Sequence, residues 1–281
     1  MDPLATGVLP LCLGEATRLA EYLSGQEKSY FTEVLLGYTS STYDTEGELL
    51  QQGASFHLET EEVEAALSSF RGRIWQRPPR YSALSQGGKR LYALARAGVE
   101  VEIAPREVEI SKLTLLPCTE WPFTPKPPGE YLCLEIHCSK GTYIRSLVHD
   151  LGQALGCGAV MSGLVRLSSG GFRLSDALTP EAVEAFVAEG CFEDILHPLS
   201  PDLLGLDWLV LQEQEQEALR FGRPVAVDPD RIQGNKPADA KDPLELLLIG
   251  SAGLVAIGTL DIPGCLLLPR KVFSAAIPIG L

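Results

Sequence analysis

The sequence predicts an α+β protein, with a mixed, largely antiparallel sheet flanked by helices and a small β-rich domain after it. Segments with strand spacing and segments with helix spacing follow one another without the regular alternation of a parallel sheet. After residue 200 the chain changes character, because one short helical segment (213–221) precedes three apolar runs (244–249, 254–260 and 265–268). These two observations predict two domains, residues 1–200 and residues 201–281.

The first part of the chain predicts two helices with a strand between them. Residues 14–23 have helical spacing and end at Ser24-Gly25, residues 30–36 read as a strand, and residues 39–47 form a polar loop. Thr60 is expected to cap the second helix. The apolar residues expected to enter a core are Val8, Leu9, Leu11 and Leu13 before the first helix, and Val63, Ala66, Leu67 and Phe70 on the second.

The middle of the chain is rich in proline and glycine. Two prolines exclude a helix over residues 77–83, which are expected to form an exposed loop with two arginines and a tyrosine. Gly87-Gly88 precedes a predicted helix over 89–97, and residues 99–110 are predicted to form a pair of strands. Residues 121–129 contain four prolines and are expected to be an extended connector.

Clear alternation and clear capping signals follow. Residues 131–138 alternate as a half-buried strand. Lys140-Gly141 turns into a helix that ends at Leu155 and Gly156 and buries Ile144, Leu147, Val148 and Leu151. Thr179-Pro180 predicts the start of another helix, with threonine as its cap and proline in its first turn.

The charge of the chain is unevenly distributed. The net charge is −14, yet residues 71–96 hold seven basic residues and no acidic one. We interpret this window as a basic patch that can grip phosphates locally, although a solvated helix face with scattered arginines is the plainer alternative. No apolar run approaches the length of a membrane span. Asp2 and Pro10 are inconsistent with a secretory signal, so a cytoplasmic protein is expected.

The cysteines and histidines give no sign of a metal. The seven cysteines are odd in number and contain no C-x-x-C, so they predict buried free thiols rather than a disulfide framework or a zinc site. The histidines have no ligand spacing, and Gly87-Gly88-Lys89 lacks the other residues of a phosphate-binding loop.

One stretch at the start of the chain carries chemical information. In Asp2-Pro3-Leu4-Ala5-Thr6-Gly7, proline restricts Asp2 to extended or turn geometry, and Gly7 permits a bend or a close backbone approach. The dipeptide alone is better explained by a surface turn. The whole stretch, continuing to Gly14-Glu15-Ala16-Thr17, resembles the signature of the bacterial tRNA pseudouridine synthases of the TruB type, which isomerise one T-arm uridine. The resemblance implies that Asp2 is the catalytic residue.

The reaction implied by this resemblance needs only a few catalytic groups. Uracil leaves its ribose, rotates and reattaches through carbon, so no cofactor and no metal are expected. A carboxylate must act on the nucleoside, an aromatic side chain must hold the flipped base, and a cation must orient the carboxylate. The family's K-x-Y falls on Lys28 and Tyr30, which implies that Tyr30 stacks on the base and assists proton transfer.

Two further motifs support the resemblance. The family's K-G-T-Y-I-R implies that Arg145 pairs with Asp2 and that Tyr143 lines the pocket. Leu164 and Arg166 match an L-R-R segment that Val165 interrupts, with Leu164 as pocket wall. Arg77, Arg80 and Lys89 are expected to contact T-arm phosphates. Asp44 matches a family position near the site, although a turn-forming aspartate, or a glycosidase acid pair with Asp2, remains an alternative.

The resemblance extends loosely to the C-terminal domain, whose Leu267-Leu268-Pro269-Arg270-Lys271-Val272-Phe273 resembles the small, PUA-like RNA-binding domain of such enzymes. The partner is therefore expected to be the T arm of tRNA, bound by a monomer. Family members carry a few dozen residues before the Asp motif, so this chain is expected to lack a segment and to isomerise poorly. A non-catalytic RNA-folding protein is the rival hypothesis, and a synthase that uses a guide RNA or another RNA is a third.

Overall fold

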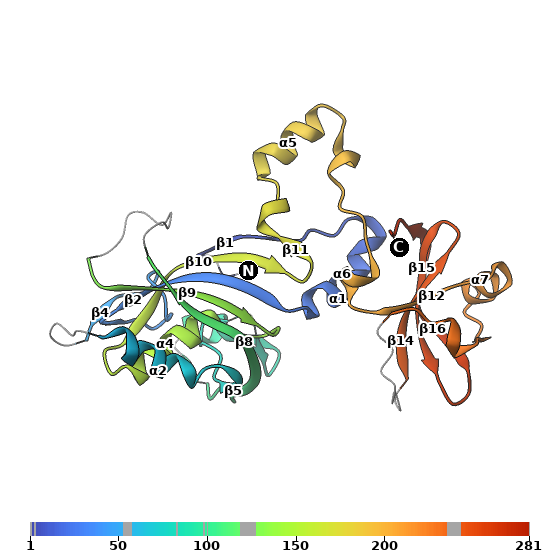
Figure 1. Cartoon of the computed structure of the whole chain (residues 1–281). Coiled ribbons are helices and arrows are strands. Elements are labelled where there is room, and N and C mark those ends of the chain that lie inside the picture. Colours follow the sequence, from blue (N-terminus) through green and yellow to red (C-terminus); the bar gives the residue numbers. More distant parts are fainter. Residues whose placement is uncertain are drawn as a thin grey trace. The chain divides into compact units, whose positions relative to one another are not determined.

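The computed structural model describes residues 2, 4–52, 58–82, 84–97, 99, 101–118, 128–234 and 243–280 (Figure 1). The chain divides into two compact units. The N-terminal unit is Met1–Leu9, Glu27–Ser169 and Arg173–Ser175, and the C-terminal unit is Pro10–Gln26, Gly170–Phe172 and Asp176–Leu281. The boundary expected after residue 200 falls inside the C-terminal unit, and the two expected domains stay a prediction.

The N-terminal unit is built on one sheet with the strand order β1-β10-β2-β9-β8-β5. Its strands are β1 (Ala5–Gly7), β2 (Lys28–Leu36), β5 (Gly72–Gln76), β8 (Arg106–Leu116), β9 (Tyr131–Cys138) and β10 (Ala159–Ser169). Only the pair β1–β10 along this path is parallel, so the sheet is largely antiparallel, as predicted.

Two helices pack together in the core of this unit, α2 (Thr60–Ser68) and α4 (Ile144–Ala154), and α4 also contacts β2 and β10 (Figure 1). Leu147 and Leu151 are one turn apart on α4, and both are at most 1% exposed among Leu134 and Ile136 of β9. Burial of this apolar stripe stabilises the helix, because complete burial of each such side chain contributes about 1.5–3 kcal/mol. The packing therefore fixes the N-terminal turn of α4 over the sheet.

Several predicted boundaries in this unit need correction. The cap of α2 is Glu59 rather than Thr60, because Glu59 and Glu62 form a reciprocal capping box. The helix expected over 89–97 is α3 (Leu91–Arg96), because β6 (Ser85–Gln86) and β7 (Lys89–Arg90) form a hairpin around two glycines with positive φ. The strand pair expected over 99–110 is wrong, since the described residues from 99 to 105 belong to no strand and Arg106 begins the single long strand β8. A further short hairpin joins β3 (Tyr38–Thr39) and β4 (Leu50–Gln51).

The C-terminal unit contains a second sheet with the order β12-β14-β15-β16-β13. Its strands are β12 (Asp207–Val210), β13 (Val225–Ala226), β14 (Leu244–Gly250), β15 (Gly253–Asp261) and β16 (Leu266–Ile277). Its helices are α1 (Ala20–Gly25), α5 (Pro180–Ala188), α6 (Pro201–Leu204) and α7 (Glu213–Arg220), with short 3₁₀ turns η1 (Gly14–Leu19), η3 (Phe192–Ile195) and η4 (Pro229–Arg231). The short strand β11 (Phe172–Arg173) pairs with β10 of the first sheet, and the 3₁₀ turn η2 (Leu174–Asp176) follows it. Thr179 caps α5 as predicted, and the three apolar runs are strands.

The apolar residues near the start of the chain do not behave as expected. Val8 is buried, but Leu9, Leu11 and Leu13 are 56%, 79% and 52% exposed. Hydrophobic character alone does not predict that a side chain is buried, because apolar atoms still form much of a protein surface.

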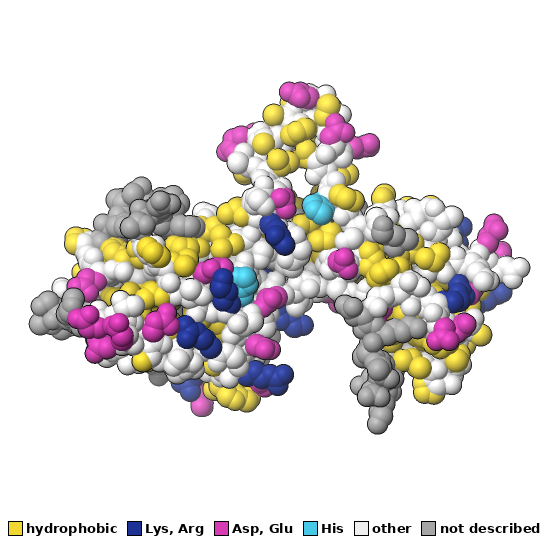
Figure 2. All heavy atoms as spheres, in the orientation of Figure 1, with side chains coloured by type: hydrophobic (Ala, Val, Ile, Leu, Met, Phe, Trp, Pro, Cys, Tyr) yellow, Lys and Arg dark blue, Asp and Glu magenta, His cyan; other side chains and the backbone are white. Residues whose placement is uncertain are grey.

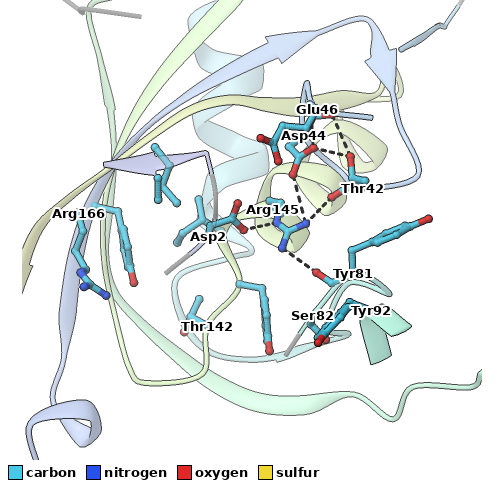
Figure 3. A pocket seen from close by; sticks show the side chains of 15 residues that line it. Asp2, Thr42, Asp44, Glu46, Tyr81, Ser82, Tyr92, Thr142, Arg145 and Arg166 are labelled. Carbon is cyan, nitrogen blue, oxygen red and sulfur yellow. Dashed lines mark hydrogen bonds and ion pairs between the residues drawn. The ribbon is translucent and has the colours of Figure 1, made fainter. Parts of the chain in front are cut away.

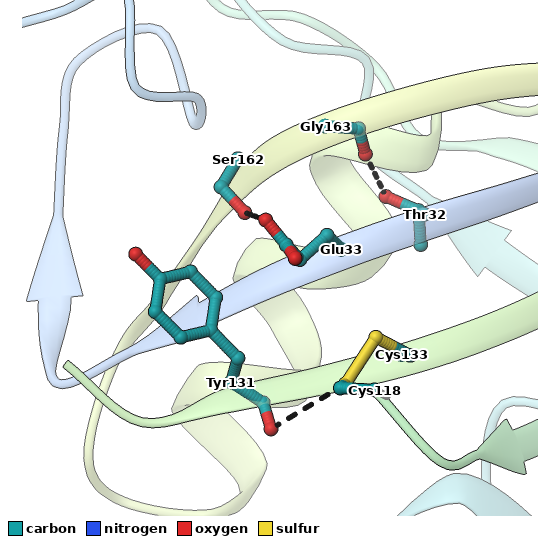
Figure 4. Close-up of a disulfide and its surroundings, with 7 residues drawn as sticks. All are labelled: Thr32, Glu33, Cys118, Tyr131, Cys133, Ser162 and Gly163. Atoms are coloured by element: carbon teal, nitrogen blue, oxygen red, sulfur yellow. Dashed lines mark hydrogen bonds between the residues drawn. A yellow bond between two sulfur atoms is a disulfide. The ribbon is translucent and has the colours of Figure 1, made fainter. Parts of the chain in front are cut away.

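The structure also corrects the prediction that the cysteines are all free thiols. Cys118 and Cys133 form a disulfide with a Cα–Cα distance of 5.4 Å (Figure 4). The register explains the pairing, because Leu116 lies opposite Cys133 across β8 and β9, and Cys118 follows two residues later. The remaining cysteines are free, and of these Cys138 and Cys157 are buried.

Some basic residues of the window 71–96 lie beside acidic residues in the folded structure, although the window itself contains no acidic residue. On the face shown in Figure 2, acidic side chains gather around α2 and basic ones around β5 and β8. Arg71 pairs with Glu64 at 2.8 Å, and Arg73 lies 3.8 Å from Glu107. Part of the window is therefore paired with carboxylates that lie outside it in the sequence.

The described residues contain neither a membrane-spanning helix nor a cluster of metal-binding side chains. No helix among them is long and apolar enough to cross a membrane. The same residues hold no group of three or more side chains suited to a metal ion.

Candidate active site

The N-terminal unit contains a cavity of about 580 Å³ (Figure 3). Its wall combines the first residues of the chain, the start of β2, the middle of β10, the N-terminus of α4, and two loops around residues 42–46 and 81–82. Of the predicted site residues it includes Asp2, Tyr30, Tyr143, Arg145, Leu164 and Arg166. Segments far apart in sequence thus bring most of the expected site together.

Asp2 is placed by the parallel pairing of β1 with β10. Its carbonyl accepts a hydrogen bond from the Ala5 amide at 3.0 Å, so a turn precedes the strand. Gly7 lies opposite Arg166 with a φ of 95°, and a Cβ there would come within 2.3 Å of the Arg166 carbonyl oxygen. Only glycine fits this close approach, which explains the glycine in the motif.

Arg145, in the first turn of α4, is the centre of the polar network. Its Nε lies 2.6 Å from Asp2 Oδ2, an ion pair without hydrogen-bond alignment, and its Nη1 lies 3.3 Å from Asp44 Oδ2. Nη1 also donates to the Thr42 carbonyl at 3.1 Å and Nη2 to the Tyr81 carbonyl at 2.9 Å. With its side chain 10% exposed, this guanidinium is fixed from several directions.

Asp44 belongs to this network rather than to an exposed turn. Its side chain is 2% exposed, and Oδ1 accepts from Thr42 Oγ1 at 2.5 Å and from the Glu46 amide at 3.1 Å. The loop is joined to β10, because the Met161 amide donates to the Tyr43 carbonyl and the Met161 carbonyl accepts from the Thr45 amide. Tyr43 has a φ of 63°, a strained conformation that this attachment maintains.

Tyr30 and Arg166 face each other across β2 and β10. Burial raises the pKa of the Tyr30 phenol, Cys138 adds to the rise, and a hydrogen bond with Arg166 opposes it. Arg166 is itself held, because its Nε donates to the Val8 carbonyl at 2.6 Å. The pair therefore presents a largely buried aromatic ring beside a fixed cation.

Gln76 supports the site without lining the cavity. It is 2% exposed, and its amide makes a reciprocal pair with the backbone of Tyr143, donating to the carbonyl at 3.0 Å and accepting from the amide at 2.8 Å. Ser146 Oγ donates to the Arg77 carbonyl at 2.8 Å. Sequence reasoning missed Gln76, and nothing in its local sequence marks it.

The remaining predicted residues lie elsewhere. Lys28 is not part of the cavity wall; its pKa is lowered, first by burial and then by the charge of Arg166. Arg77 and Arg80 are exposed and line a second cavity of about 450 Å³ with Tyr43, while Pro78 and Pro79 are buried. The loop over residues 77–83 is therefore only partly exposed. The side chain of Lys89 lies outside the described part of the structure.

Sequence reasoning also missed several residues of the wall, namely Thr42, Glu46, Tyr81, Ser82, Tyr92 and Thr142. Tyr81 was noted as a loop residue and Thr142 lies within the K-G-T-Y-I-R motif, but neither was given a role in the site. Their positions follow from contacts between loops, since Arg145 binds the Tyr81 carbonyl and the Tyr92 amide binds the Ser82 carbonyl.

Known proteins resemble the chain in sequence. The family model of the TruB family pseudouridylate synthase N-terminal domain matches residues 1–144, and that of the tRNA pseudouridylate synthase B C-terminal domain matches residues 145–210. The chain is 46% identical over 228 residues to tRNA pseudouridine synthase B of Pseudomonas fluorescens strain Pf0-1, covering 80% of this chain and 72% of that protein. The same identity and shares hold for tRNA pseudouridine synthase B of Pseudomonas aeruginosa strain UCBPP-PA14.

Solved structures resemble it in fold. A chain in "Structure of H/ACA RNP bound to a substrate RNA containing 2'-deoxyuridine" gives a TM-score of 0.65 at 22% identity, covering 98% of this chain and 74% of that one. A chain in "Crystal Structure of a Cbf5-Nop10-Gar1 Complex" gives 0.64 at 22%, covering 100% and 74%. At this identity the likeness concerns the fold, and it agrees with the α+β architecture. With family models matching most of its length, the chain belongs to the TruB family of pseudouridylate synthases.

Proposed function

We propose that this chain is a tRNA pseudouridine synthase that isomerises the T-arm uridine at position 55, with Asp2 as the nucleophile. The observation that carries the proposal is the Asp2 carboxylate in the cavity. Oδ2 is paired with Arg145, whereas Oδ1 has no hydrogen-bond partner among the described residues. One oxygen is thus held in place, and the lone pairs of the other are not engaged by any hydrogen bond from the described residues.

The surrounding residues support definite roles. The target base flips out of the RNA, stacks on Tyr30 and lies against Leu164, which both line the cavity. Asp2 acts on C1′ as the bond from C1′ to N1 breaks, the uracil turns, and C5 bonds to C1′ as the carboxylate leaves. C5 loses its proton and N1 gains one, so atoms and oxidation state are conserved and neither cofactor nor metal takes part.

Arg145 holds the Asp2 carboxylate in one orientation, and Asp44 holds Arg145. Small displacements of a reacting group cost large factors in rate, so this doubly anchored guanidinium is suited to catalysis. The buried Tyr30 phenol, whose pKa is raised, keeps its proton at neutral pH and can take part in proton transfer.

The choice of tRNA rests on the names of the relatives, all tRNA pseudouridine synthase B, and the T-arm position rests on the motif resemblance. Arg77, Arg80 and Lys89 contact the phosphates of the arm, with Lys28 and Tyr143 closer to the base. Residues 201–281 form an additional RNA-binding domain. The enzyme acts as a cytoplasmic monomer.

The test is incubation of the chain with unmodified tRNA, without any guide RNA, followed by chemical mapping of pseudouridine. Pseudouridine at position 55 is the expected result. Tight binding with no pseudouridine in any tRNA would favour the rival function, an RNA-folding protein. Conversion of uridine that requires an added guide RNA would favour the third hypothesis, a synthase that uses a guide RNA.

A further inference from the structure

A buried hydroxyl in the cavity wall has no role in the chemistry described above. Within the described part of the chain, the buried side-chain atoms without a hydrogen-bond partner are Asp2 Oδ1, Ser82 Oγ, Arg145 Nε, His149 Nδ1 and Thr259 Oγ1. Three of the five belong to the wall of this cavity. Asp2 and Arg145 form an ion pair, which leaves Ser82 Oγ unexplained.

The backbone around Ser82 is anchored on both sides. The Tyr81 carbonyl accepts from Arg145 Nη2 at 2.9 Å, and the Ser82 carbonyl accepts from the Tyr92 amide at 3.2 Å. Two residues later, the Leu84 carbonyl accepts from the Leu91 amide at 2.7 Å. Ser82 is 5% exposed and lies beside Tyr92 in the wall (Figure 3).

A buried polar group without a partner destabilises a fold, and most native proteins contain few of them. The backbone of Ser82 cannot move away, because the carbonyls of Tyr81 and Ser82 are bound, so only rotation about the Cα–Cβ bond can turn the buried Oγ toward a ligand in the cavity. A hydroxyl both donates and accepts hydrogen bonds, so a ligand with adjacent carbonyl and imide groups satisfies it. The uracil ring has such an edge.

We propose that Ser82 Oγ hydrogen-bonds the carbonyl–imide edge of the flipped pyrimidine and is a recognition residue of the site. The inference rests on the proposed function, because that function brings uracil into this cavity. The energy of the unpartnered hydroxyl in the empty cavity then contributes to binding when the base arrives.

Two variants separate recognition from a structural role. Ser82→Ala is expected to lower the single-turnover rate of pseudouridine formation at subsaturating tRNA by about threefold to tenfold, the loss typical of one neutral hydrogen bond. Its melting temperature is expected to stay the same or rise, because no bond within the protein is lost. Ser82→Cys, with a weak donor of similar shape, is expected to fall between alanine and wild type.

The matched control is Thr259→Val in the C-terminal unit, which removes another buried hydroxyl without a partner in the described structure. It is expected to leave both the rate and the melting temperature at or above wild type. A lowered melting temperature for Ser82→Ala alone would show that the serine is structural and would overturn the inference.

Substrate analogues identify the contact through a double-mutant cycle. Wild type and Ser82→Ala are compared on tRNA with uridine, 2-thiouridine, 4-thiouridine or 3-methyluridine at the target position. Each analogue changes one atom of the carbonyl–imide edge. The analogue that changes the atom bonded to Ser82 is expected to slow the wild-type enzyme but not Ser82→Ala. If the rate loss from Ser82→Ala and the rate loss from the analogue multiplied for all three analogues, the two changes would be independent and the inference would be overturned. A Ser82→Ala rate within twofold of wild type on uridine would also overturn it. Neither result would affect the proposed function. Wild type that converts no uridine would overturn the proposed function as well.

Discussion

The arginines of the N-terminal unit occupy two contrasting environments. Arg145 has a side chain that is 10% exposed and meets two carboxylates and two carbonyls. Arg73 is 76% exposed at its side chain and has a carboxylate only at 3.8 Å, and Arg77 and Arg80 are also exposed. A buried charge acts through fixed geometry, whereas an exposed charge acts through the field that it contributes and is screened by salt. Substitution of a buried arginine is therefore expected to lower the reaction rate and the stability, whereas substitution of an exposed arginine is expected to weaken RNA binding.

The largest expected effect is at the anchored carboxylate. Asp2→Asn keeps the shape of the side chain but removes the proposed nucleophile, so isomerisation should fall on the order of a thousandfold or more. Binding of tRNA should change little. Single-turnover pseudouridine yield and a filter-binding assay measure the two quantities. Asp261→Asn, an exposed aspartate of the C-terminal unit, is the matched control. Turnover near the wild-type rate would end the assignment of Asp2.

Replacement of the buried guanidinium tests geometry against charge. Arg145→Lys keeps the positive charge, but one ammonium cannot reach the four groups that the guanidinium contacts. We expect a roughly hundredfold loss of rate and a lower melting temperature, because the Thr42 and Tyr81 carbonyls lose a donor and the ion pair with Asp44 is weakened. Arg73→Lys should change neither. If Arg145→Lys retained the wild-type rate, charge alone would suffice and the contrast between the two environments would fail.

A smaller effect on the rate is expected at Gln76, which supports the site indirectly, through the backbone of Tyr143. Gln76→Ala leaves the backbone amide and carbonyl of Tyr143 unpaired, which should lower the free energy of unfolding by about 1–3 kcal/mol. The rate should fall about tenfold, because Arg145 follows Tyr143 by two residues. Urea denaturation and single-turnover kinetics test both, with exposed Gln51→Ala as control. A loss of stability with an unchanged rate would limit Gln76 to a structural role.

The smallest effect per residue is expected at the exposed cations. Neutralising Arg77, Arg80 and Lys89 should weaken tRNA binding and lower the slope of log K against log salt by about 0.7–0.9 for each lost contact. The rate at saturating tRNA should stay close to wild type. Arg71 and Arg73, already paired with Glu64 and Glu107, provide controls from the same window. An unchanged slope would show that the RNA binds elsewhere.

Sequence reasoning succeeded where one segment carries its own signal. The strand β9, the helix α4 and the cap at Thr179 follow from alternation, helical spacing and turn chemistry, and the structure confirms them. The motifs around Asp2 and Arg145 were also sufficient to predict their pairing.

It failed where the cause lies in the register of distant segments. β10 was not predicted, because it is buried on both faces and shows no alternation. Cys118 and Cys133 form a disulfide because β8 and β9 pair, which their spacing does not reveal. Gln76 and Ser82 contribute through contacts that exist only after the loop of residues 76–82 meets α4 and α3.

The first turn of α4 holds that loop at three points. Tyr143 exchanges two hydrogen bonds with Gln76, Arg145 binds the Tyr81 carbonyl, and Ser146 binds the Arg77 carbonyl. The loop cannot swing open without breaking all of these bonds together, and such cooperative opening is rare compared with the fluctuation of a free loop. This wall therefore works as a fixed template rather than a lid, and under the proposed function the RNA, not the loop, deforms when the base enters.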